Sequence, residues 1–217
     1  MFDWETFLPR FLHDARAVLR KAATKAQMLD RRWDEDSPDL RKLLRETIDT
    51  QANLDILFRR LGTFMEAHHP PAMEKLPLRT IVGLARMKKK DRLSAAGADL
   101  KIGELCSATA AAELQTVLEE LLDNSIAFIS AERPLAIHID ACIEGEIVRV
   151  TFADNACGWD PKVGDAVFEP LQRLDPRGGF GLGLAIARAV ITNAGGSIVA
   201  TTSPAGSTFE MDLPLDN

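Results

Sequence analysis

A glycine-rich loop is the first stretch of this chain whose residues suit chemistry. It reads RGGFGLGL over residues 177–184, and an apolar, helix-forming run follows at 185–194. Glycine permits tight turns and a close approach of the backbone to a ligand. The start of a helix offers free N–H groups and the positive end of the helix dipole to an anion. The loop is therefore a candidate phosphate site, although plain turns share its composition.

Two polar residues upstream of the loop stand one helical turn apart. Glu120 and Asn124 lie in an expected helix at 108–129, so they share one of its faces. An amide oxygen beside a carboxylate can hold a hydrated Mg²⁺ ion, which prefers oxygen ligands and keeps several waters. Taken alone, this pattern also fits a solvated helix face.

A third candidate, Asp154, stands at the end of an expected strand and is followed by small residues. A carboxylate there can accept a hydrogen bond from the exocyclic amine of a purine, and it can equally cap a turn. The irregular segment that follows carries Phe168, which can anchor a loop by packing. It also carries Arg173 and Arg177, whose guanidinium groups could meet phosphates or water.

Two long helices are expected before these residues. Apolar side chains recur every three or four positions over residues 3–33 and again over 38–67, and Ser37 and Pro38 suit the start of the second helix. Helices joined by so short a turn form an antiparallel hairpin, but one hairpin cannot bury both apolar stripes. Pairing of two copies into a four-helix bundle would bury them, so we expect a homodimer through these helices.

The proline-rich stretch HHPPAMEKLP separates this hairpin from the rest of the chain. We place the domain boundaries there, with a hairpin at 1–68, a linker at 69–77 and a second domain at 78–217. The second domain mixes helical and strand patterns, which favours an α+β fold with helices on one face of a mostly antiparallel sheet. Its expected helices are 78–87, 108–129 and a glycine-started helix ending at 194. Its expected strands are 99–102, 135–143, 146–153, 197–202 and 208–213. The charged run 88–92 is expected to be a solvated turn.

The candidate residues occur in a particular order along the chain. Glu120 and Asn124 come first, then Asp154, then the segment with Phe168 and Arg173, then GGFGLGL and a late GSTF at 206–209. In this order they closely resemble the ATP-binding domain of sensor histidine kinases, in the wider family that includes gyrase, Hsp90 and MutL. The resemblance covers residues 78–217 and implies a two-layer α/β sandwich that binds ATP and Mg²⁺.

The same resemblance implies a role for each matching residue. Asn124 would hold Mg²⁺, Asp154 would read adenine, and residues 160–180 would form a lid over ATP. The full set expected to bind the nucleotide is Asn124, Asp154, Gly158, Phe168, Arg173, Gly179, Gly181, Leu182, Gly183 and Thr208.

The first helix of the hairpin carries a further candidate. The run FLHDAR at residues 11–16 resembles the phosphoacceptor box of these kinases, and His13 lies off the apolar line of its helix, so we expect it to be exposed. A neutral imidazole nitrogen is a competent nucleophile for a γ-phosphoryl group. Asp14 could hydrogen-bond the other ring nitrogen and so fix the tautomer.

The sequence departs from the family pattern at several of these positions. Members usually have Thr or Asn four residues after the histidine to position a hydrolytic water, and here the residue is Ala17, so we expect a poor phosphatase. Ala127 and Ala156 replace an expected basic residue and an expected glycine, which puts the strength of ATP binding in doubt. Glu120 stands where many histidine kinases have Asn and resembles the general base of the ATP-hydrolysing relatives.

The function that this resemblance implies is a dimeric, ATP-dependent protein-histidine kinase of a two-component system. It would phosphorylate His13 and pass the phosphoryl group to an aspartate on the receiver domain of a response regulator. We expect a separate or upstream sensor, because the sequence contains none. The alternatives are a phosphorelay phosphotransferase or scaffold with a degenerate ATP domain, and an ATP-hydrolysing switch that uses Glu120.

Composition excludes several other classes of protein. The net charge of −6 argues against a general nucleic-acid binder. No apolar run approaches membrane-spanning length and the N-terminus is no signal peptide, so we expect no direct membrane insertion. The cysteines, Cys106, Cys142 and Cys157, lack metal-ligand spacing and favour free thiols in a reducing cytoplasm.

Overall fold

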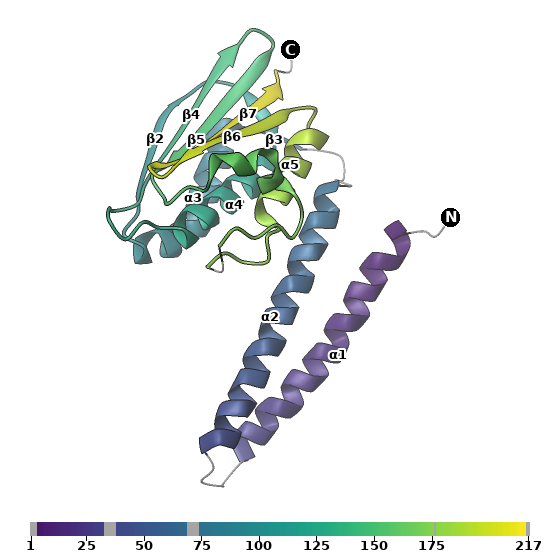
Figure 1. Cartoon of the computed structure of the whole chain (residues 1–217). Coiled ribbons are helices and arrows are strands. Elements are labelled where there is room, and N and C mark those ends of the chain that lie inside the picture. The colour runs from purple at the N-terminus through teal and green to yellow at the C-terminus, as the bar shows by residue number, and fades with distance from the viewer. Residues whose placement is uncertain (1–3, 33–37, 69–73, 176, 216–217) are drawn as a thin grey trace. The chain divides into compact units, whose positions relative to one another are not determined.

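A computed structural model describes residues 4–32, 38–68, 74–175 and 177–215 of the chain. Contacts between residues divide the chain into two compact units, Met1–Met65 and Glu66–Asn217 (Figure 1). None of the described helices combines the length and the apolar content that crossing a membrane requires.

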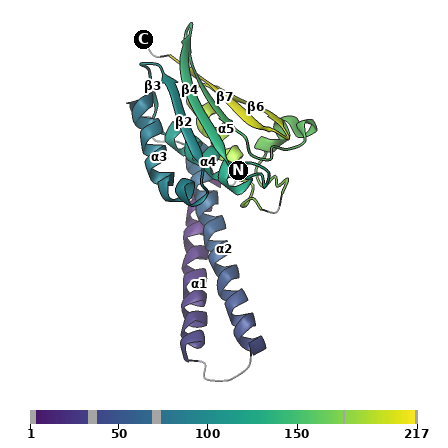
Figure 2. The ribbon, with the colours of Figure 1, turned by 90° about the vertical axis from the view of Figure 1, so that its left-hand side faces the viewer.

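The first unit is a pair of long helices. Helix α1 spans Trp4–Arg32 and helix α2 spans Pro38–His68, and Figures 1 and 2 both show them side by side and antiparallel. The expected helical hairpin is therefore confirmed. Large apolar side chains stay exposed on it because a single hairpin has too little surface to cover them: Met28, Leu29, Leu43, Leu54 and Ile56.

The second unit is built on a five-stranded sheet with the order β2-β4-β5-β7-β6. The parallel pair β2–β4 lies at one edge, and all other neighbours are antiparallel. This arrangement confirms the expected α+β fold. The strands are β2 (Asp99–Leu105), β4 (Ala136–Glu144), β5 (Ile147–Asp154), β6 (Ser197–Ser203) and β7 (Gly206–Pro214).

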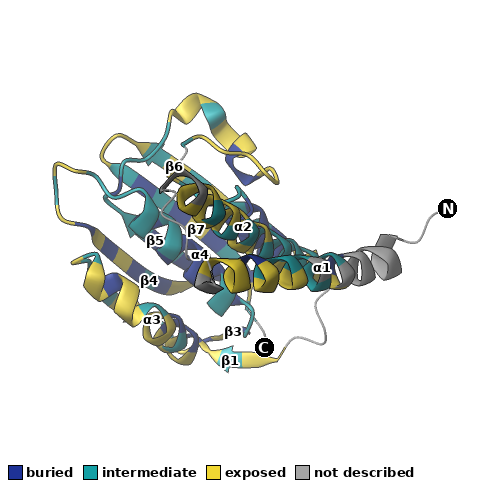
Figure 3. Ribbon diagram, turned by 90° about the horizontal axis from the view of Figure 1, so that it is seen from below, coloured by how far each residue is buried: buried dark blue, intermediate teal, exposed yellow. Residues whose placement is uncertain are grey.

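Three helices cover one face of this sheet, as Figures 1 and 2 show. They are α3 (Leu78–Ala95), α4 (Leu114–Ala127) and α5 (Gly183–Asn193), and α4 packs between the other two. Strand residues alternate between buried and more exposed classes because successive side chains point to opposite faces (Figure 3). The core under α4 is fully closed, since Val117, Leu118, Leu121 and Leu122 have no exposed surface.

Two short strands and a 3₁₀ segment complete the unit. Strand β1 (Lys75–Pro77) pairs antiparallel with β3 (Thr109–Ala111), so the last residues of the proposed linker belong to the folded unit. The 3₁₀ segment η1 (Pro161–Phe168) lies within the region expected to be irregular.

The helix expected at 108–129 was wrong at its start, because residues 109–111 pair with β1 and α4 begins only at Leu114.

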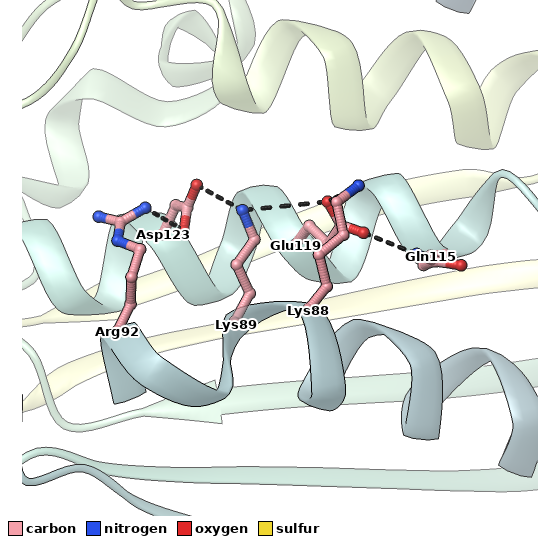
Figure 4. A network of polar contacts seen from close by, with 6 residues as sticks. All are labelled: Lys88, Lys89, Arg92, Gln115, Glu119 and Asp123. Atoms are coloured by element: carbon pink, nitrogen blue, oxygen red, sulfur yellow. Dashed lines mark hydrogen bonds and ion pairs between the residues drawn. The ribbon is translucent and has the colours of Figure 1, made fainter. Parts of the chain in front are cut away.

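The charged run at residues 88–92 was also wrongly expected to be a solvated turn. It continues α3 as far as Ala95, because its cations face acidic side chains on α4 (Figure 4). Lys88 Nζ lies 2.8 Å from Glu119 Oε2. Lys89 Nζ lies 2.8 Å from Asp123 Oδ2, and Arg92 pairs with the other oxygen of that carboxylate. These pairs hold α3 against α4 along their length.

Candidate functional site

Asp154 lies at the end of β5 and its carboxylate is held on both oxygens. Oδ1 accepts hydrogen bonds from the backbone N–H of Ala156 at 3.0 Å and of Ser207 at 3.3 Å. Oδ2 lies 2.6 Å from the hydroxyl oxygen of Ser125, which comes from α4. The carboxylate is thus fixed by three different elements while its residue remains partly accessible. A group so oriented can present its remaining lone pairs to one amine donor.

The face of α4 that precedes Ser125 carries the two other polar candidates. Glu120 is buried, with 6% of its surface exposed, and Asn124 is half-buried. A solvated helix face is therefore excluded for Glu120. Asn124 directly precedes Ser125, whose hydroxyl group contacts Asp154, so Asn124 lies on the turn of α4 next to the end of β5. Glu120 lies one helical turn earlier on α4.

Two glycines let the backbone close tightly around Asp154. A Cβ on Gly206 would lie 2.0 Å from the backbone oxygen of Asp154, and Gly206 has a φ of +140°. A Cβ on Gly158 would lie 2.0 Å from the carbonyl oxygen of Ser203. Both positions therefore require glycine, and they bring the β6–β7 turn against the segment that follows Asp154.

Thr208 does not lie beside Asp154 in this arrangement. In the register of the sheet Asp154 stands opposite Ser207, and Thr208 stands opposite Ala153. Because side chains alternate along a strand, Thr208 points to the opposite face of the sheet from Asp154. The residue opposite Asp154 is the buried Ser207, and nucleotide binding by Thr208 stays a prediction.

A backbone hydrogen bond joins the glycine-rich loop to the segment that precedes it. The N–H of Leu171 donates to the carbonyl oxygen of Gly181 at 2.8 Å. A Cβ on Gly181 would lie 2.4 Å from the Gln172 oxygen, and its φ is +69°. Gly183 is the first residue of α5, as expected for a loop that opens a helix. Gly179 is exposed and Leu182 is buried, so Leu182 anchors the loop through packing.

The segment before the glycine loop is anchored on α5. Phe168 is 3% exposed, and the guanidinium carbon of Arg188 lies 4.1 Å from the centre of its ring. Arg188 also lies 3.3 Å from the Asp165 carboxylate. The expected role of Phe168 as a packing anchor therefore agrees with its position. Arg173 is exposed in the same loop.

Arg177 is engaged by a neighbouring acid rather than left to the solvent. Its guanidinium and its backbone N–H both donate to Asp175, and these hydrogen bonds hold the pKa of the Asp175 carboxyl below its ordinary value. The Arg177 guanidinium also lies 5.8 Å from the centre of the Phe128 ring at the end of α4. The loop is thus tied to the helix that carries Asn124.

In the helical hairpin, His13 is exposed as expected. The side chain of Asp14 lies outside the described residues. A groove on α1 begins about one turn after His13, and three of its lining residues are basic. The groove is lined by Ala17, Arg20, Lys21, Thr24 and Lys25.

The nucleotide expected at this site fits the donors and acceptors that are present. The Asp154 carboxylate is pre-oriented, and the glycine loop precedes the N-terminus of α5. Among the described residues no group of three or more His, Cys, Asp or Glu side chains could hold a metal ion. Asn124 carries an amide oxygen, which is a type of ligand that Mg²⁺ accepts.

Sequence reasoning missed the groups that orient Asp154. Ser125 directly follows Asn124 in the sequence, so its hydroxyl group could have been considered together with the polar residues of that helix. The N–H donors of Ala156 and Ser207 have no residue-type signal, because every residue except proline carries such a group. Arg133 and Arg188 were also missed, since their partners are distant in the sequence.

Comparison with known proteins agrees with this geometry. A family model described as "Histidine kinase-, DNA gyrase B-, and HSP90-like ATPase" matches residues 109–217, which is half of the chain. The chain is 28% identical to the phytochrome-like protein Cph1 of Synechocystis over 94% of its own length and 28% of that protein. It is 30% identical to the C4-dicarboxylate transport sensor protein DctB of Rhizobium meliloti, over 72% of the chain and 24% of that protein. The chain thus spans about a quarter of the length of these relatives.

Solved structures share the fold of both units. The full-length ShkA structure, in complex with AMPPNP, superposes with a TM-score of 0.76 at 20% identity, covering 97% of this chain and 46% of that one. The Acinetobacter baumannii histidine kinase AdeS superposes with a TM-score of 0.65 at 19% identity, covering 94% of this chain and 98% of that one. The chain therefore belongs to the family of histidine kinase-, DNA gyrase B- and HSP90-like ATPases and has the make-up of a histidine kinase catalytic core.

Proposed function

We propose that the second unit binds Mg-ATP with its adenine at Asp154. The observation that carries this proposal is the fixed Asp154 carboxylate, oriented by Ser125 and by two backbone N–H groups. Oriented in this way, it can accept a hydrogen bond from the exocyclic amine of adenine without reorganising. The N-terminus of α5 and the loop before it would meet the phosphates, and Asn124 would contribute an oxygen to Mg²⁺.

We propose that His13 is the residue that accepts the γ-phosphoryl group. It is exposed on α1, so an approaching nucleotide can reach it. A ring nitrogen would form the new N–P bond as the bond between the γ-phosphorus and the bridging oxygen breaks, releasing ADP. Bound ATP would supply the phosphoryl group, and the residues of the chain would mainly position the reactants and neutralise charge.

The phosphoryl group would pass from His13 to an aspartate of a response-regulator receiver domain. The groove on α1 supports this proposal, because Arg20, Lys21 and Lys25 offer positive charge close to His13 in sequence. A receiver surface that carries acidic residues is complementary to such a groove. The relatives to which the chain is similar are sensor proteins, and the sensor for this chain would be a separate partner or an upstream segment.

The hairpin would also form the dimer. Exposed Met28, Leu29, Leu43, Leu54 and Ile56 leave apolar surface that a second hairpin would cover. A homodimeric kinase acting in the cytoplasm, where ATP is available, is therefore our proposal for the whole. A dissociation constant for self-association, measured by analytical ultracentrifugation, tests the dimer directly.

A phosphorelay protein that never uses ATP is the second candidate. It is favoured by Ala127 and Ala156, which replace a basic residue and a glycine of the family pattern. Against it stand Asn124, Asp154 and the glycine loop, which keep the residues that the family pattern expects at an ATP site.

Isothermal titration calorimetry with ATP and Mg²⁺ tests the proposal. We expect the parent protein to bind and Asp154→Asn to weaken binding at least about tenfold, because the amide offers an acceptor of lower charge and adds competing donors. Asp99→Asn is the matched control, since Asp99 is exposed on β2 and pairs only loosely with Lys101 at 3.5 Å. Absence of ATP binding by the parent protein would favour the phosphorelay candidate.

A further inference from the structure

Arg133 makes an unusual set of contacts in the loop between α4 and β4. Its Nε donates to the carbonyl oxygen of Asn155 at 2.8 Å. Its Nη2 donates to the carbonyl oxygens of Ala156 at 3.1 Å and of Pro204 at 2.7 Å. The side chain is half-buried, and no acid takes part in these bonds. A planar guanidinium holds several carbonyl oxygens in a rigid fork, whereas a lysine ammonium group is a point charge on a flexible stem and fixes their geometry less well.

The carbonyls that Arg133 joins belong to the two segments that orient Asp154. Ala156 supplies one of the N–H groups that bind Asp154 Oδ1. Pro204 lies in the turn between β6 and β7, three residues before Ser207, which supplies the other N–H group. The guanidinium therefore joins the backbone of Ala156, which donates to Oδ1, to the turn that precedes the second donor, Ser207.

We propose that Arg133 is a positioning residue that sets the selectivity of the site for adenine. The inference rests on the proposed binding of ATP at Asp154. With Arg133 in place, the donors from Ala156 and Ser207 stay converged on Oδ1, and the carboxylate presents its free lone pairs in one direction. Without it, Ser207 stays paired with Asp154 in the sheet, but the turn at Pro204 loses its link to Ala156. The donors on Oδ1 are then held less firmly, and the Asp154 carboxylate gains freedom to rotate about its terminal bond.

The fold itself does not depend on Arg133. Asn155 is tied separately to the start of β4, because its side-chain oxygen accepts from the N–H of Ala136 at 2.8 Å and its amide donates to Pro134 at 2.9 Å. Cys157 is tied to the end of α4, since its N–H donates to the Phe128 oxygen at 2.9 Å. Loss of Arg133 therefore leaves the segment after β5 and the β6–β7 pair attached, and removes the hydrogen bonds that join Ala156 to the turn at Pro204.

The test compares ATP with inosine triphosphate, which carries the same phosphates and has a carbonyl oxygen in place of the exocyclic amine. Both are titrated calorimetrically, with Mg²⁺, into the parent protein, Arg133→Gln, Arg133→Lys and Arg149→Gln. Arg149 is the matched control because it is also an arginine with several hydrogen bonds, to Asp212 at 2.7 and 2.9 Å and to Glu144 at 2.7 Å. Its partners lie away from Asp154 in the sheet register.

We expect the parent protein to prefer ATP by about tenfold or more, because a carboxylate faces a carbonyl oxygen in the inosine complex. Arg133→Gln should lower this preference at least about fivefold while changing the affinity for inosine triphosphate less than about twofold. Arg133→Lys should keep an intermediate preference, and Arg149→Gln should keep the parent preference.

Two results would overturn the inference alone. One is an unchanged preference in Arg133→Gln, and the other is an equal loss of affinity for both nucleotides, as a purely structural role would produce. If Arg133→Gln does not fold, Arg133→Lys decides in the same way. If instead the parent protein binds neither nucleotide, or binds both equally, the proposed function fails and the inference fails with it.

Discussion

Lys89 provides the sharpest test of how the two helices that frame the site are held together. Its Nζ lies 2.8 Å from Asp123 Oδ2 and 3.9 Å from Glu119 Oε2 (Figure 4), and its side chain is 15% exposed. Lys89→Met keeps most of the aliphatic stem that packs between α3 and α4 and removes the charge. The substitution leaves two acidic groups, one helical turn apart on α4, with one fewer cation.

The expected loss of stability follows from burial. Breaking a fully buried ion pair by removing one partner costs about 3–5 kcal/mol. Here Lys88 still pairs with Glu119 and Arg92 still pairs with Asp123, so we expect Lys89→Met to lower the free energy of unfolding by about 2 kcal/mol. An exposed pair in the same unit, Lys101 with Asp99 at 3.5 Å, has exposed fractions of 72% and 63%. Lys101→Met should therefore cost no more than about 0.5 kcal/mol.

Urea unfolding of the two variants measures this difference. Trp159 is the tryptophan of the second unit, so its fluorescence can be followed in a background where Trp4 and Trp33 are replaced by phenylalanine. The difference between Lys89→Met and Lys101→Met should exceed about 1 kcal/mol. Equal midpoints and slopes for the two variants would refute the reasoning, because burial of the network would then carry no energetic weight.

Three further outcomes follow from single positions. Gly206→Ala should destabilise the second unit by about 3 kcal/mol and weaken ATP binding, because its Cβ would lie 2.0 Å from a backbone oxygen. The control, Gly145→Ala, stands at a φ of +63° with open space around it and should cost only about 1 kcal/mol. Equal urea midpoints for the two variants would contradict this prediction. Hydrogen bonds from Arg149 lower the pKa of Asp212, so this carboxylate adds stability above its unfolded pKa of about 3.9 that is lost as the pH falls through the folded pKa. Arg149→Gln should therefore flatten the fall in urea midpoint between pH 7 and pH 3, and an unchanged fall would exclude this linkage. Ala17→Thr should speed the decay of a phosphorylated receiver domain about tenfold by offering a hydroxyl to the attacking water, whereas an unchanged rate of loss of ³²P would argue against that role for position 17.

The elements with strong periodicity could be predicted from the sequence. The apolar spacing over 3–33 and 38–67 matches α1 and α2 closely, and the strands at 135–143 and 146–153 match β4 and β5 to within one residue. These patterns are local, because each reports the face that an element buries. The predicted helix at 78–87 ended too early, because a run of lysines is typical of a solvated turn unless its acidic partners on α4 are known.

The candidate site could be predicted only in part. Asp154 and the glycine loop could be chosen as candidates from residue type and order alone, and their binding of a nucleotide stays a prediction. The contacts on the Asp154 carboxylate come from the backbone N–H groups of Ala156 and Ser207 and from the hydroxyl group of Ser125, which belong to different parts of the chain. Such contacts leave no pattern in the sequence because they depend on tertiary packing rather than on spacing.

Transfer of label from γ-³²P-ATP, in the presence of Mg²⁺, tests the central claim most directly. The parent protein, His13→Gln and Asn124→Ala would be incubated side by side, with Asn53→Ala on α2 as the matched control for the amide substitution. An autophosphorylating histidine kinase predicts an acid-labile, base-stable label on the parent protein and on Asn53→Ala, and none on the other two variants. A label that persists in His13→Gln, or a parent protein that binds ATP and acquires no label, would contradict the account.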